Sequence, residues 1–210
     1  MPKNQIFISH TKKDIRFCDL VDKLFARVSL KAFRSEYEDI KHPEWKTIKD
    51  ALNNSKALFL LIGKELVRNQ GLKISGWEHT QNWIAYEIGL ACQLSIDVWA
   101  ICDDVFINFP MPYVNNYFPM RLKPMTKMNF SSGIKTDIDL IYLKSIIESY
   151  DSNINFPYPF SSLSSNAKYV KDVNCRYCGA QFNYHAVQKR LFVKCPQCLK
   201  MINLSLPKLI

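Results

Sequence analysis

The stretch that decides the fold is Lys56-Ala57-Leu58-Phe59-Leu60-Leu61-Ile62-Gly63. A strand with one face in water alternates polar and apolar residues, whereas a continuous apolar run is typical of a parallel strand buried on both faces. The run is also far shorter than the roughly 18 to 20 apolar residues that cross a bilayer. Because Met1 to Gln5 is polar as well, we expect a soluble cytoplasmic protein without a membrane segment. The run itself is expected at the middle of a sheet.

Strand and helix patterns alternate on both sides of this run. The strand patterns lie at residues 6–9, 30–33 and 96–102, and a fifth strand is expected near 123–130. Apolar residues at helical spacing predict helices after Asp14, at 45–54, around Trp83 and Glu87, and at 138–150. Loops are expected at 36–43, 64–81 and 106–118. The alternation predicts an α/β fold with a doubly wound, five-stranded parallel sheet, which binds ligands outside the carboxyl ends of its strands.

The positive charge of the chain is concentrated near its end. The formal net charge is +9 over 210 residues. Residues 1–150 carry 20 Lys and Arg against 17 Asp and Glu, and residues 151–210 carry 8 against 2. A basic surface that could meet nucleic acid is therefore expected only in the tail, and a solvated basic face explains the same charge.

Four of the seven cysteines form two pairs in the tail, Cys175-Arg176-Tyr177-Cys178 and Cys195-Pro196-Gln197-Cys198. Two Cys-x2-Cys pairs separated by 16 residues predict a tetrahedral zinc site, with a hairpin between the pairs. Four thiolates leave no position for a water molecule, so the zinc is expected to be structural. A pair of disulfides is the alternative, which a reducing cytoplasm disfavours.

The composition divides the chain into three parts. Residues 1–150 are expected to form the α/β domain, and 172–210 a small β domain around the zinc, which resembles a zinc ribbon. Residues 151–171 are rich in proline and serine and are expected to be a linker.

Glu87 is the leading candidate for a catalytic residue. Trp83 and Glu87 stand four residues apart, so one helix face offers a ring and a carboxylate together. A carboxylate among apolar residues is costly to desolvate, and is therefore either paired or kept for chemistry. A glutamate at the rim of the helix is the other interpretation.

The order of these motifs resembles a TIR domain of the prokaryotic type over residues 4–150. The matching landmarks are Ile6-Phe7-Ile8-Ser9-His10 with Asp14, the helix that leads into 57–61, and Trp83-x-x-x-Glu87. The resemblance implies a flavodoxin-like fold and, in enzymatic members, cleavage of NAD at the nicotinamide–ribose bond. It implies that Glu87 is the catalytic glutamate. Substrate loops would fall at Ser9 to Lys13 and at Glu36 to Pro43, although the second loop lacks the glycine of many members.

The substrate contacts that we expect come from residues near Glu87. Trp83 would stack on a ring, Ser9 and His10 would line the pocket, and Lys12 and Lys13 would meet the pyrophosphate. Local backbone contacts of the serine, a partly buried histidine and solvated lysines explain the same residues.

The resemblance implies an NAD glycohydrolase or ADP-ribosyl cyclase in antiphage defence signalling. Its product would be ADP-ribose or a cyclic ADP-ribose that signals to an effector protein. Such sites are often completed by self-association, so a homo-oligomer is expected. A non-catalytic TIR adaptor and a nucleic-acid-binding zinc-ribbon protein are the alternatives.

Overall fold

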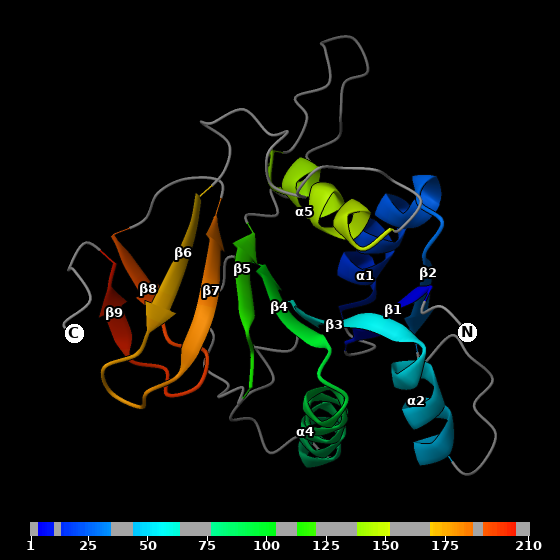
Figure 1. The fold of residues 1–210 in the computed structure, drawn as a ribbon, viewed down its shortest axis with the longest axis horizontal. Coiled ribbons are helices and arrows are strands. Elements are labelled where there is room, and N and C mark those ends of the chain that lie inside the picture. The colour runs from blue at the N-terminus through cyan, green and yellow to red at the C-terminus, as the bar shows by residue number, and fades with distance from the viewer. Residues whose placement is uncertain are drawn as a thin grey trace, which may run out of the picture.

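The computed structural model describes residues 4–10, 14–34, 44–63, 77–103, 113–120, 138–151, 169–186 and 191–204. In these residues the chain is an α/β protein built on a mostly parallel sheet of seven strands (Figure 1). The strands of this sheet are β1 (Gln5–Ser9), β2 (Lys31–Arg34), β3 (Ser55–Ile62), β4 (Asp97–Asp103), β5 (Asn116–Met120), β6 (Tyr169–Asn174) and β7 (Gln181–Ala186). A separate two-stranded sheet consists of β8 (Phe192–Lys194) and β9 (Met201–Asn203).

The large sheet has the strand order β2-β1-β3-β4-β5-β7-β6. Its first five strands are all parallel, and their order, 2-1-3-4-5, is that of flavodoxin-like doubly wound folds. The α/β class and the parallel sheet are therefore confirmed. The expected number of five strands is wrong, because β7 continues the sheet beside β5 and β6 pairs with β7 in the antiparallel sense.

The apolar run of the sequence forms β3, the strand between β1 and β4. Leu58 and Leu60 belong to one hydrophobic core, and Phe59 and Leu61 belong to the other. All four side chains are fully buried. Because the side chains of β3 pack alternately into the two cores, neither face of the strand meets water, and its sequence is apolar throughout.

Helices cover both faces of the sheet, as the sequence pattern predicts. Figure 1 shows α2 (Glu44–Asn53) and α4 (Trp77–Gln93) on one side, and α1 (Ile15–Asp22) and α5 (Ile138–Ser149) on the other. A 3-10 helix, η2 (Lys23–Arg27), follows α1. Ile48 and Leu52 of α2 and Ile88 of α4 pack in one core, whereas Val21 of α1 and Ile146 of α5 pack in the other.

Two predicted boundaries are wrong. The strand beside β4 is β5, which begins at Asn116, at the end of the aromatic stretch 106–118 that we expected to be a loop, and continues to Met120. The place predicted for a fifth strand, 123–130, lies outside the described residues. Prolines in this stretch suggested a loop, and Pro119 nevertheless lies in β5, where it pairs with Cys102 of β4. The β5–β7 pairing covers only Asn116 and Tyr117, so β5 is paired on one side only at Pro119, the setting in which a strand tolerates a proline. The predicted loop at 64–81 gives way to α4 at Trp77.

The two cysteine pairs lie at the tips of two hairpins rather than at the ends of one. The first pair connects β6 to β7, and the second connects β8 to β9. The predicted single hairpin between the pairs is therefore wrong, because β7 forms its ladders with β6 and β5 instead of β8. The tail thus shares the large sheet with the first 150 residues.

None of the helices among the described residues is long and apolar enough to cross a membrane.

His185 anchors β7 to the α/β part of the chain. Its side chain is buried, and its ring lies 4.6 Å from the ring of Trp99 on β4, centroid to centroid. His185 Nδ1 forms a 3.0 Å hydrogen bond with the hydroxyl of Tyr142 on α5, and Nε2 a 3.1 Å bond with Oδ1 of Asn116 on β5. Burial raises the pKa of Tyr142 above its usual value, which keeps its hydroxyl protonated. One side chain therefore joins β7 to three elements of the α/β part.

We expect His185→Phe to lower the free energy of unfolding by about 1–3 kcal/mol, because it removes both buried hydrogen bonds. Gln181→Ala, an exposed change on the same strand, is the matched control and should have an effect within about 0.5 kcal/mol. Urea denaturation followed by circular dichroism measures both. Equal stabilities of the two variants would contradict the role of His185 as an anchor.

Candidate functional site

Buried polar side chains gather where β1 and β2 end. Ser9 is the last residue of β1 and His10 follows it, while Arg34 is the last residue of β2. Ser9 and Arg34 are each only 2% exposed. We call Ser9, His10, Asp14, Arg34 and Glu87 the strand-end cluster. It lies at the carboxyl ends of parallel strands, the edge where doubly wound sheets bind their ligands.

Glu87 lies in this cluster and is 5% exposed. The Ser9 hydroxyl donates a 2.5 Å hydrogen bond to Glu87 Oε2, across 78 positions of sequence. A charge-assisted bond of this kind offsets part of the desolvation cost of a buried carboxylate. The structure thus brings together two of the residues that the sequence suggested for one site.

Trp83 lies one helical turn before Glu87 on α4. Its ring is partly buried against the core and meets the ring of Tyr86 edge-on, with 5.8 Å between centroids. The spacing places Trp83 and Glu87 on one side of the helix, as predicted. Lys12 and Lys13, the remaining predicted contacts, lie outside the described residues, as does the loop 36–43.

Arg34 connects the cluster to α1. Its Nη1 forms ion pairs with Asp22 and, at 3.5 Å, with Asp19. Its Nε donates a 3.1 Å hydrogen bond to His10 Nε2. A ring nitrogen that accepts a bond carries no proton, so a neutral His10 has its proton on Nδ1. Arg34 was not among the predicted site residues, although a charged residue directly after the apolar pair Ala32-Phe33 was a visible signal.

Asp14 lies against the end of β3. It stands at the start of α1, but its side chain forms no capping bond there. A Cβ added to Gly63, the residue after β3, would lie only 2.2 Å from Asp14 Oδ1. The absent side chain of Gly63 therefore makes room for a carboxylate that is 6% exposed. The sequence suggested Asp14 as the start of a helix and as a landmark of the TIR resemblance, but not as a residue of the site.

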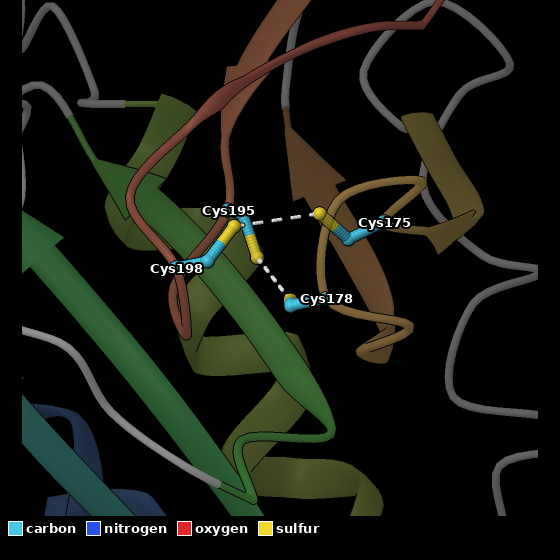
Figure 2. A group of neighbouring side chains, drawn as sticks. All are labelled: Cys175, Cys178, Cys195 and Cys198. Atoms are coloured by element: carbon cyan, nitrogen blue, oxygen red, sulfur yellow. Dashed lines mark hydrogen bonds between the residues drawn. The ribbon is translucent and has the colours of Figure 1, made fainter.

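The four tail cysteines form a second cluster, which we call the cysteine cluster (Figure 2). Their sulfur atoms all lie within 4.8 Å of one another, so the cluster could hold a metal ion. The sulfurs of Cys175 and Cys198 are 3.6 Å apart, and those of Cys178 and Cys195 are 3.8 Å apart. Both distances far exceed the S–S bond of a disulfide, about 2.05 Å, and all four cysteines are free. Around a tetrahedral zinc, with Zn–S bonds of about 2.3 Å, sulfurs stand about 3.8 Å apart.

The two turns that carry these cysteines have the same backbone geometry. The Gly179 amide donates to the Cys175 carbonyl at 2.7 Å, and the Leu199 amide donates to the Cys195 carbonyl at 3.0 Å. Each residue after a pair is left-handed, with φ of 74° at Gly179 and 63° at Leu199. Leucine rarely adopts this conformation, so the second turn keeps the shape despite a local cost.

The environment of Cys195 fits a metal ligand. Burial raises the pKa of its thiol to about 12, while the backbone amides of Cys198 and Gln197 donate to the sulfur and act in the other direction. A buried thiolate is therefore costly alone, and a metal cation would remove that cost. The Cys195 sulfur is thus removed from water and also receives two backbone N–H donors that stabilise its thiolate form.

No protein-family model and no curated protein matches this chain. The fold and the two clusters therefore define its class. It is an α/β protein with a mostly parallel sheet, a buried carboxylate at the strand ends, and four cysteines that could hold a metal ion.

We expect Gly63→Ala to displace the Asp14 carboxylate and to lower the free energy of unfolding by about 1–3 kcal/mol, because the added methyl group overlaps it. Gly89→Ala is the matched control. A Cβ at Gly89 would meet nothing within 4 Å, and alanine favours a helix by up to about 1 kcal/mol. Urea denaturation should therefore move the two midpoints in opposite directions. A stabilised Gly63→Ala would contradict the close packing of Asp14.

Proposed function

We propose that this chain is a TIR-like, NAD-consuming enzyme that cleaves the nicotinamide–ribose bond, with Glu87 as its catalytic residue. The observation that carries the proposal is the buried hydrogen bond between Ser9 and Glu87 at the carboxyl ends of the parallel strands. The sequence resemblance had suggested both residues for one pocket. The 2-1-3-4-5 strand order is compatible with a flavodoxin-like TIR fold.

The chemistry suits a single carboxylate. The nicotinamide of NAD is already a cationic leaving group, so no second carboxylic acid has to protonate it, unlike the leaving groups of most glycosides. As the bond breaks, positive charge develops on the ribose. Glu87 would stabilise this charge in a site with little water, where an electrostatic interaction is strong. The same carboxylate would hold the ribose hydroxyls.

The neighbouring residues have supporting roles in this proposal. Ser9 would fix the orientation of the Glu87 carboxylate through Oε2, and Trp83 would stack on a ring of the substrate. His10, held by Arg34, would donate from Nδ1 to the substrate. Lys12 and Lys13 would meet the pyrophosphate.

The product would be ADP-ribose if water attacks the ribose, or a cyclic ADP-ribose if the adenosine part of the same molecule attacks it. By resemblance, the reaction would serve antiphage signalling to an effector protein, and self-association of the TIR-like part would complete the site.

For the cysteine cluster we propose a structural zinc ion in a zinc-ribbon arrangement. Cys175, Cys178, Cys195 and Cys198 would fill all four positions of a tetrahedral ion, which leaves none for catalysis. The zinc would connect the β6–β7 hairpin to the β8–β9 hairpin, since each contributes two of the thiolates.

We expect the purified chain to contain one zinc ion, measured by mass spectrometry of the metal. Cys195→Ser should lose most of it, because the serine hydroxyl is a poor zinc ligand. Cys92→Ser is the matched control, since Cys92 lies on α4 outside the cluster, and it should keep the zinc. Equal zinc contents in the two variants, or two disulfides in the native chain, would contradict the site.

We expect the zinc-loaded chain to release nicotinamide from NAD, and Glu87→Gln to reduce the rate at least about 100-fold, since it removes the charge that stabilises the transition state. The matched control is Glu148→Gln on α5, where Glu148 pairs with Lys144 on the same helix. It should keep the full rate. Chromatography of the ribosyl product would distinguish a hydrolase from a cyclase.

Two outcomes would contradict the proposal, the first by removing the catalytic role of Glu87 and the second by removing the activity. One is an equal rate for Glu87→Gln and the wild type, which would leave Glu87 as a helix-rim residue. The other is no release from concentrated, folded, zinc-loaded wild type, which would favour the TIR adaptor.

A further inference from the structure

The surface around the cysteine cluster exposes large apolar side chains that a small β unit normally buries. Tyr177, in the first cysteine turn, is 44% exposed, and Phe192 and Met201, on β8 and β9, are 52% and 46% exposed. The ladder pairs Lys194 with Met201 and Phe192 with Asn203. Because side chains alternate along a strand, these four residues share the outer face of the hairpin, while Val193 and Ile202 are buried beneath it. We call this outer face together with Tyr177, Arg176 and Lys200 the tail surface.

Two cationic side chains, Arg176 and Lys200, lie over the exposed ring of Tyr177. The guanidinium carbon of Arg176 lies 4.9 Å from the centre of the ring, and Lys200 Nζ lies 4.8 Å from it. Arg176 also donates a 2.8 Å hydrogen bond to the Tyr177 hydroxyl. Lys200 follows the second cysteine pair and directly precedes β9, so Tyr177 joins the two cysteine turns. The ring and both charges are thus held at one place on the surface.

From residue 173 onward, the sequence that carries the tail surface has charges of one sign. From residue 173 to residue 210 the sequence contains six Lys and Arg and no Asp or Glu. A zinc ion with four thiolates contributes a charge of about −2, and the segment remains positive by about 4. A polyanion is therefore the complementary partner, rather than an apolar or a basic protein.

We propose that the tail surface binds single-stranded nucleic acid, independently of any NAD cleavage. Exposed rings stack on unpaired bases without regard to sequence, and neighbouring cations bind the phosphates. Tyr177 and Phe192 would stack on bases, while Arg176, Lys194 and Lys200 would contact the backbone. A single strand fits better than a duplex, because the exposed rings of Tyr177 and Phe192 can stack only on bases that are not already stacked and paired with one another.

The test is the fluorescence anisotropy of a labelled 20-nucleotide single strand, as DNA and as RNA, with the zinc-loaded full chain. We expect binding that weakens steeply between 50 mM and 200 mM salt. Tyr177→Ala should weaken binding about 10-fold, since loss of one stacking ring costs between about 5-fold and 150-fold. Lys200→Gln should weaken binding and reduce the salt dependence, whereas Tyr177→Phe, which keeps the ring, should bind within about 3-fold of the wild type.

Two controls lie outside the tail. Tyr113 is the most exposed ring among the described residues, at 69%, and Tyr113→Ala should leave binding unchanged. Lys49, exposed on α2, is the matched cation, and Lys49→Gln should bind as the wild type does. The zinc content of every variant is measured with its affinity. If Tyr177→Ala loses zinc, Lys200→Gln compared with Lys49→Gln decides the question.

Three results would overturn the proposal. The first is no binding even at 50 mM salt. The second is equal affinity of each tail variant and its control. The third is tighter binding of a duplex of the same sequence, which would replace stacking with recognition of the double helix.

Discussion

The pairing of β3 with β1 on one side and with β4 on the other is the constraint on which the rest of the structure depends. It buries the apolar run 57–62 on both faces and aligns the carboxyl ends of the central strands at one edge. The strand-end cluster follows from that alignment. Ser9 and Arg34 end neighbouring parallel strands, Asp14 follows β1 and packs on Gly63 after β3, and Glu87 reaches Ser9 from α4.

The same sheet carries the second cluster. Parallel pairing of β7 with β5 makes the β6–β7 hairpin the outermost part of the sheet, with Cys175 and Cys178 at the tip of the hairpin. The buried hydrogen bonds of His185 to Tyr142 and Asn116 hold this hairpin to the rest of the sheet. Cys175 and Cys195 belong to the same hydrophobic core as α2 and α4, and Cys198 packs against it. A metal ion there would therefore stabilise an extension of the central sheet as well as two cysteine turns. The division into domains at 150 and 171 stays a prediction, but the hydrogen bonds of the sheet cross it.

The sequence was informative wherever one local pattern has one structural meaning. The run 57–62, the helical spacing after Asp14 and at 45–54, and the paired cysteines each predicted their element or cluster, because burial on two faces, a helical stripe and tetrahedral ligation leave distinct spacings. Contacts between distant segments left no such signal. Nothing near His185 indicates that it lies between Trp99 and Tyr142, and nothing near Gly63 indicates Asp14. Pro119 concealed β5, because a proline is tolerated in a strand only where its missing N–H is not needed, and the partner strand decides that.

The two proposals assign different partners to the two clusters, NAD to the strand ends and nucleic acid to the tail surface. The first is the central one, and it depends on Glu87 facing the nicotinamide ribose. The most direct measurement is a crystal structure of the zinc-loaded Glu87→Gln chain with uncleaved NAD. We predict that the nicotinamide ribose lies within hydrogen-bonding distance of the side chain at position 87, with Ser9 beside it. NAD bound away from β1 and α4, or crystals grown with excess NAD that contain none bound, would contradict the account.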